Sequence, residues 1–184
     1  MSLIAIIIIF ICIGIDNMVS ANMSALNMSA EDKSVFSIKM ALFFTGFNVL
    51  AFMISYLLSA ITHNWIVQAS NWVAFALLLL LGIKFMLESI EKSPSFNKLD
   101  LENTRKLIKV STIIAMNSFF VGYAAETMDM ELFPAVVVLA LLTFLMTLLG
   151  FHLGKSTSKT VVSKRGELVA GLVLVIMAVC LIMP

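Results

Sequence analysis

The chain has 184 residues, of which 61% are hydrophobic and 12% charged, and its formal net charge at pH 7 is +1. So few charged side chains cannot cover the surface of a water-soluble globule, and the apolar runs approach or exceed the length that crosses a bilayer. The composition therefore excludes a soluble protein and predicts an all-α membrane protein embedded in the lipid bilayer. No nucleic-acid partner is expected.

Windows of about 20 residues predict six membrane-spanning helices. Their approximate ranges are 2–25, 37–60, 67–89, 107–126, 132–153 and 166–183. The first apolar run begins at Leu3 without the basic residues that precede the apolar core of a signal peptide, so we expect it to be retained. An even number of spans puts both termini on the same side of the membrane.

The long polar segment 90–106 predicts a solvated linker loop between a first half, 1–89, and a second half, 107–184. Every Lys and Arg lies in or beside the first, third and fifth connections. Because these residues accumulate in cytoplasmic loops, the linker is predicted to be cytoplasmic and both termini extracytoplasmic. Lys84, one turn inside the third span, is expected to extend its ammonium to the same membrane surface.

The two halves show a weak internal repeat. Ile15-Asp16-Asn17-Met18 in the first span parallels Met116-Asn117-Ser118-Phe119 in the fourth, and 72–77 in the third parallels 167–172 in the sixth. Each half has an odd number of spans, so the two copies must enter the membrane in opposite orientations. Six helices arranged as two inverted three-helix repeats are typical of transporters, whose substrate site lies near the membrane midplane.

Asp16 is a lone carboxylate inside the first apolar run. Taking a carboxylate into hydrocarbon costs a few kcal/mol, so it persists only when it is paired, protonated or bound to an ion. No Lys or Arg is expected at its depth, which makes a functional role the favoured interpretation. A polar helical face continues from it through Asn17, Ser20, Ser24 and Asn27 toward the cytoplasm.

A second polar face starts at Asn117 and Ser118 in the fourth span and runs toward Glu126 and Asp129, which we predict to form an outer mouth. Joined at the middle, the two faces would make a continuous polar route. Carboxylate and amide oxygens suit a hard cation such as Mg²⁺ or Mn²⁺. The candidate ligands, including two thioethers that could favour a transition metal, are Asp16, Asn17, Met18, Ser20, Asn48, Met116, Asn117 and Ser118.

Four short stretches now support a family resemblance. They are 14–17 (Gly-Ile-Asp-Asn); 71–75 with Leu81-Gly82; 115–118 with Val121-Gly122; and 166–168 with 171–174. With them the chain resembles the MntP-type manganese efflux pumps of the LysE-like exporter group. The resemblance implies a multi-pass protein of the bacterial inner membrane that exports manganese and has no bound cofactor.

The resemblance also implies which positions bear charge. The family usually carries an aspartate in the first and fourth spans and an acidic residue in the second, and the matching residues here are Asp16, Asn117 and Asn48. Two negative charges are therefore missing, which weakens the binding of a divalent cation in a low-dielectric site. Neutral oxygens, a thioether or the acids of the outer mouth could compensate, or the transported ion could differ.

Export against an inside-negative potential of 100 mV costs a divalent ion about 4.6 kcal/mol. The sequence has no Walker motif for binding ATP, so we predict an antiporter that is driven by H⁺ or Na⁺ as counter-ion. Access to the site at Asp16 would alternate between the two sides of the membrane.

Two alternatives remain: export of another cation or small solute, and a non-transporting scaffold subunit. An enzyme is not expected, because the sequence shows no pairing of a nucleophile with a general base. Small residues such as Gly150 and Gly154 are expected to pack within one chain, with a homodimer left open.

Overall fold

The computed structural model describes residues 3–26, 33–66, 70–90, 103–156 and 160–182, and all the regular secondary structure in these ranges is α-helical. Its six helices are α1 (Leu3–Leu26), α2 (Lys33–Ile66), α3 (Ser70–Ile90), α4 (Thr104–Thr127), α5 (Leu132–Ser156) and α6 (Thr160–Ile182). The predicted all-α class is confirmed. Within the described residues, the five helices α1 to α5 are long and apolar enough to cross a membrane, and α6 is not among them. The chain is therefore a multi-pass membrane protein.

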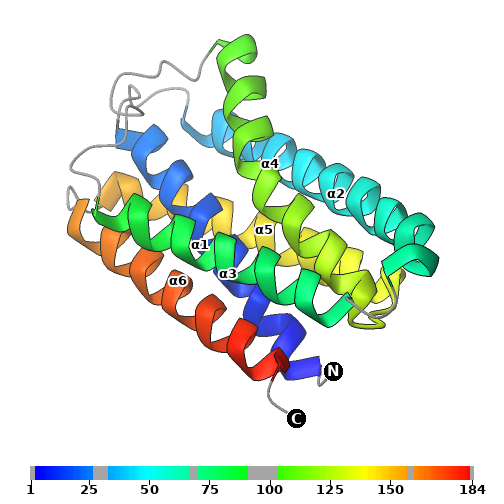
Figure 1. The fold of residues 1–184 in the computed structure, drawn as a ribbon. Helices are drawn as coiled ribbons and strands as arrows, with labels where there is room; N and C mark the ends of the chain where they lie inside the picture. The colour runs from blue at the N-terminus through cyan, green and yellow to red at the C-terminus, as the bar shows by residue number, and fades with distance from the viewer. Residues whose placement is uncertain (1–2, 27–32, 67–69, 91–102, 157–159, 183–184) are drawn as a thin grey trace.

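The helices pack mainly in three pairs, α2 with α4, α1 with α5, and α3 with α6. In Figure 1 the pair of α2 and α4 stands on one side of the bundle, α3 and α6 lie on the other, and α1 and α5 run between them. Further contacts join α2 to α5, α1 to α6 and α3 to α4. The start of α1 and the end of α6 lie at the same end of the molecule, as an even number of antiparallel helices requires (Figure 1).

Two separate apolar clusters fill the interior. The larger contains Ile13, Phe52 and Val121 among its members, and the smaller contains Ala21 and Phe44. On α1, α2 and α4 the chain passes from one cluster to the other within about two helical turns. Between the clusters these three helices bury a set of polar side chains, so the fold places a polar layer between two apolar ones. The set is Asp16, Asn17, Ser20, Asn48, Asn117 and Ser118.

Glycines let α1 approach α5 closely. A Cβ atom added to Gly150 would lie 2.1 Å from the backbone oxygen of Met18, and one added to Gly154 would lie 2.5 Å from the backbone oxygen of Asn22. Real Cβ atoms essentially never come so close, so these positions accept no side chain unless the helices move apart. The expectation that Gly150 and Gly154 pack within one chain is confirmed.

The predicted linker is shorter in the structure than in the sequence analysis. Ile90 is the last residue of α3, and α4 already begins at Thr104; most of the segment between them lies outside the described residues. Asn103 caps α4, because its side-chain oxygen accepts a hydrogen bond from the backbone N–H of Arg105 at 3.0 Å. The cap explains why the helix starts before the apolar run that was used to predict it. Lys39 donates to the Thr104 hydroxyl at 3.1 Å and links the starts of α2 and α4.

Candidate functional site

Five polar side chains from three helices meet in the layer between the apolar clusters. We call them the polar centre: Asp16 and Asn17 of α1, Asn48 of α2, and Asn117 and Ser118 of α4. The two asparagines of α1 and α2, together with Asn117 and Ser118, are fully buried, and Asp16 is only 8% exposed. The structure thus brings together five of the eight candidate ligands, although Asp16 and Asn117, for example, are 101 positions apart in the sequence.

Hydrogen bonds join these side chains in two groups. The Asn117 amide Nδ2 donates to Asp16 Oδ2 at 2.7 Å. In the second group, Ser118 Oγ donates to Asn48 Oδ1 at 2.5 Å, and Asn48 Nδ2 donates to Asn17 Oδ1 at 3.3 Å and to the Phe44 carbonyl at 2.7 Å. The positions that the sequence repeat matches, Asp16 with Asn117, are thus in direct contact.

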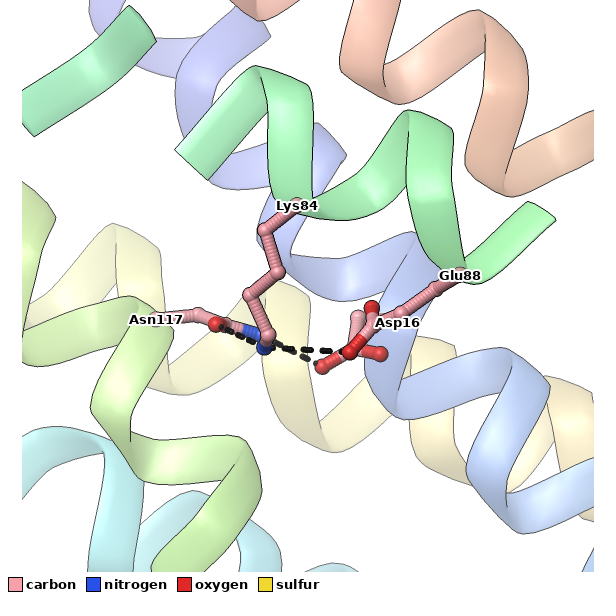
Figure 2. A network of polar contacts seen from close by, with 4 residues as sticks. All are labelled: Asp16, Lys84, Glu88 and Asn117. Atoms are coloured by element: carbon pink, nitrogen blue, oxygen red, sulfur yellow. Dashed lines mark hydrogen bonds and ion pairs between the residues drawn. The ribbon is translucent and has the colours of Figure 1, made fainter. Parts of the chain in front are cut away.

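Lys84 is a member of the site that the sequence analysis missed. Its ammonium donates to Asn117 Oδ1 at 2.6 Å and lies 3.4 Å from Glu88 Oε1, one turn further along α3 (Figure 2). The prediction that Lys84 extends to the membrane surface is wrong, and so is the expectation that no cation lies near Asp16. Because α3 packs against α4, the four-carbon stem of Lys84 reaches across to Asn117, and the ammonium finds its partner there and not at the membrane surface.

Asp16 therefore shares its surroundings with two other charged groups. The ammonium of Lys84 and the carboxylate of Glu88 both act on Asp16 electrostatically, with opposite signs. The side chains of Lys84 and Glu88 are 35% and 39% exposed, so this pair lies at the edge of the bundle while Asp16 lies inside it. Their spacing of four residues on one helix is the signal that could have predicted the pair.

Asn17 contributes an unusual feature to the polar centre. Its Nδ2 is buried, and among the described residues it has no hydrogen-bond partner. An unsatisfied buried donor costs about 1–3 kcal/mol, and native proteins retain such groups mainly at functional sites or beside a water or ion. The orphaned donor thus indicates that another polar group belongs in this layer.

The remaining candidate ligands lie further from Asp16. Ser20 is buried one turn along α1, where its backbone carbonyl accepts a hydrogen bond from Ser24 Oγ at 2.7 Å. Met18 is half-buried, and its backbone faces Gly150 of α5. The side chain of Met116 is 55% exposed on the outside of the bundle, so the structure does not bring it to the centre. Successive helical residues point in directions about 100° apart, which separates Met116 from Asn117.

The two residues of the predicted outer mouth differ in their surroundings. Glu126 is half-buried and accepts a hydrogen bond from Ser59 Oγ at 2.7 Å, whereas Asp129 is exposed and has a positive φ of 56° in the turn after α4. Asn27, at the far end of the other polar face, lies outside the described residues. Among the residues that the structure describes, no group of three or more His, Cys, Asp or Glu side chains could hold a metal ion.

Replacing Asn48 by Leu should destabilise the bundle. The substitution removes one acceptor and one donor from the polar centre, so Ser118 and Asn17 stay buried but lose their hydrogen bonds to Asn48. Each unsatisfied group costs about 1–3 kcal/mol, and a lower midpoint of thermal unfolding in detergent would reveal the loss. Thr112→Val is the matched control, because the exposed Thr112 hydroxyl bonds to the carbonyl of Ile108 in its own helix. An equal midpoint for both variants would contradict the role of Asn48.

A buried carboxylate with a lysine close to it, both on membrane-length helices, is typical of membrane transporters, since ionisable groups within membrane-spanning segments mark ion and substrate paths. The family comparison agrees with this class. Residues 31–182 match the model of the MntP family, described as "Putative manganese efflux pump", and the chain belongs to this family.

Several relatives carry the same description. The "Putative manganese efflux pump MntP" of Desulfitobacterium hafniense is 30% identical over 136 residues, covering 74% of this chain and 71% of the relative. That of Acetivibrio thermocellus is 28% identical over 72% of this chain and 67% of its own length. "Putative manganese efflux pump MntP 2" of Clostridium botulinum is 23% identical over 97% of this chain and 93% of the relative. No solved structure matches the chain significantly.

Proposed function

We propose that this protein exports Mn²⁺ across the bacterial inner membrane and binds the ion at the polar centre, with Asp16 as its charged ligand. The family supports metal efflux as the activity. The observation that carries the site is the burial of Asp16 in one polar layer with Asn117, Asn48 and Ser118, whose side chains each contain an oxygen atom. Oxygen donors of this kind suit a hard divalent cation, and one carboxylate supplies part of the charge that the ion needs.

Alternating access is supported by the symmetry of the helix packing. Exchanging α1 with α4, α2 with α5 and α3 with α6 turns the α1–α5 pair into α4–α2 and the α1–α6 pair into α4–α3, and leaves the α3–α6 and α2–α5 pairs unchanged. Two inverted three-helix repeats, 1–89 and 107–184, would produce this pattern. We propose that the repeats rock around the polar centre, which would then lie near the membrane midplane.

Export must also be driven. A membrane potential of 100 mV, negative inside, opposes the exit of a divalent ion by about 4.6 kcal/mol. We therefore include an incoming H⁺ or Na⁺ as the coupling ion. The Lys- and Arg-rich connections favour a cytoplasmic linker and extracytoplasmic termini. The ion would then reach Asp16 from the side of the linker and leave on the opposite side, past Glu126.

Uptake into inside-out membrane vesicles tests this function directly. Vesicles that contain the protein should accumulate Mn²⁺ more than Mg²⁺, Zn²⁺ or Cd²⁺, and a change of pH or of Na⁺ should alter the rate if either is the counter-ion. Vesicles from cells without the protein are the control. If no divalent ion accumulated above that control, a non-transporting scaffold would become the better interpretation.

A second candidate, export of a small zwitterionic solute such as an amino acid, gains one observation from the structure. Lys84 places an ammonium near Asp16, so the site offers both charges that a zwitterion needs. Because Asn117 and Glu88 already hold this ammonium, we favour the metal ion. Amino acids added to the same vesicles should not compete with Mn²⁺; strong competition would support the second candidate.

A further inference from the structure

The ammonium of Lys84 is bound to the side-chain oxygen of Asn117 in the polar centre. Asn117 has a single side-chain acceptor, Oδ1, and this atom receives the hydrogen bond from the Lys84 ammonium at 2.6 Å. The other end of the same amide, Nδ2, donates to Asp16. Figure 2 shows Asn117 in contact with both Lys84 and Asp16. In this arrangement Asp16 faces an N–H group and not an oxygen of Asn117.

A cation held by both Asp16 and Asn117 requires the opposite orientation of the amide. Oδ1 would have to turn toward Asp16, a rotation of about 180°, because an amide N–H is a donor and cannot ligate a cation. The rotation would bring Nδ2 against the Lys84 ammonium, and two donors repel each other. Lys84 must therefore leave Asn117 before this ligand pair can form.

Glu88 offers the ammonium an alternative partner. Its Oε1 already lies 3.4 Å from Lys84 Nζ on the same helix, so the ammonium can release Asn117 and keep Glu88 as its partner. Both side chains are partly exposed at the edge of the bundle, where such a movement meets little packing. Lys84 thus has one partner in the polar centre, Asn117, and a second partner beside it, Glu88.

We propose that Lys84 is a tethered cation that closes the polar centre when no substrate is bound and moves to Glu88 when a substrate cation enters. This inference rests on the proposed export function and deepens it. In the empty protein, Asp16, Glu88 and Lys84 together carry one net negative charge; without the ammonium they would carry two. Moving uncompensated charge through a low-dielectric interior is costly, so Lys84 should assist the return step without Mn²⁺, in which one incoming H⁺ or Na⁺ neutralises the remaining charge.

Lys84→Met separates this role from a purely structural one. In reconstituted vesicles the variant should still exchange internal for external Mn²⁺, because exchange never requires a return step without Mn²⁺. Net Mn²⁺ efflux should fall by about tenfold or more, the factor that corresponds to losing a hydrogen bond to a charged group. The purified variant should also bind Mn²⁺ about tenfold more tightly, since its internal competitor is gone.

Two further variants complete the test. Lys84→Arg keeps the charge and should restore net efflux, and Lys39→Met, which removes an ammonium bonded to Thr104 far from the site, should stay within about twofold of the wild type. If K84M kept net efflux, or lost exchange and efflux together, the inference would be overturned. Should K84M fail to fold, Glu88→Gln must weaken Mn²⁺ binding, and an unchanged affinity would overturn it. Wild-type vesicles without any Mn²⁺ transport would instead refute the proposed function, and this inference with it.

Discussion

Replacing Asp16 by Asn should abolish manganese export while the protein still folds. Asparagine has nearly the same shape, and the buried site already accepts amides at three neighbouring positions. What is lost is the buried negative charge that we propose as the charged ligand. Outer-shell changes around metal sites already cost 10–100-fold in affinity or activity, so loss of the charged ligand should cost about 100-fold or more. Cellular manganese and growth in excess Mn²⁺, measured in a strain without other manganese exporters, provide the readout.

Glu131→Gln is the matched control for this experiment. It removes the same kind of charge from an exposed residue in the turn between α4 and α5, remote from the polar centre. We expect this variant to protect cells as the wild type does. If the Asp16→Asn variant, at equal abundance in the membrane, lowered cellular manganese as well as Glu131→Gln, Asp16 could not be the charged ligand.

Much of the fold follows from the sequence because membrane solvation imposes strong rules. Apolar runs of bilayer length must be helical, since a backbone in hydrocarbon has to satisfy its own hydrogen bonds. Helix ends were less predictable. The structure extends α2 from Lys33 to Ile66, well past the predicted span 37–60, because helices continue into the polar region beyond the apolar run that identifies them.

The polar centre was predictable in part for the same reason. Asp16 and Asn117 are conspicuous because polar groups are costly in hydrocarbon, and the repeat suggested that they correspond. Lys84 was not predictable in the same way, since a lysine near a helix end can reach either the membrane surface or a neighbouring helix. Only the packing of α3 against α4 decides between these directions. For Met116, proximity in sequence to Asn117 was misleading, because the two side chains point to different sides of α4.

Because α1 packs closely on α5, we also expect a large loss of stability from a substitution at Gly150. Replacing this glycine by Ala should destabilise the bundle by about 3 kcal/mol, the upper end of the usual cost of overpacking. The added methyl group would meet the backbone of Met18, and unlike a side chain the backbone cannot turn away. Met18 lies two residues after Asp16, so a displacement of α1 should impair transport as well. Thermal unfolding in detergent and vesicle uptake of Mn²⁺ measure the two consequences.

Gly46 supplies the matched control within the same chain. It is an exposed helical glycine, and a Cβ atom added there meets nothing within 4 Å. Gly46→Ala makes the same chemical change without a clash, so it should leave transport intact and raise stability by up to about 1 kcal/mol through helix propensity. The sign of the stability change should therefore differ between the two glycines. Equal unfolding midpoints for Gly150→Ala and Gly46→Ala would contradict the close contact between α1 and α5 at Gly150.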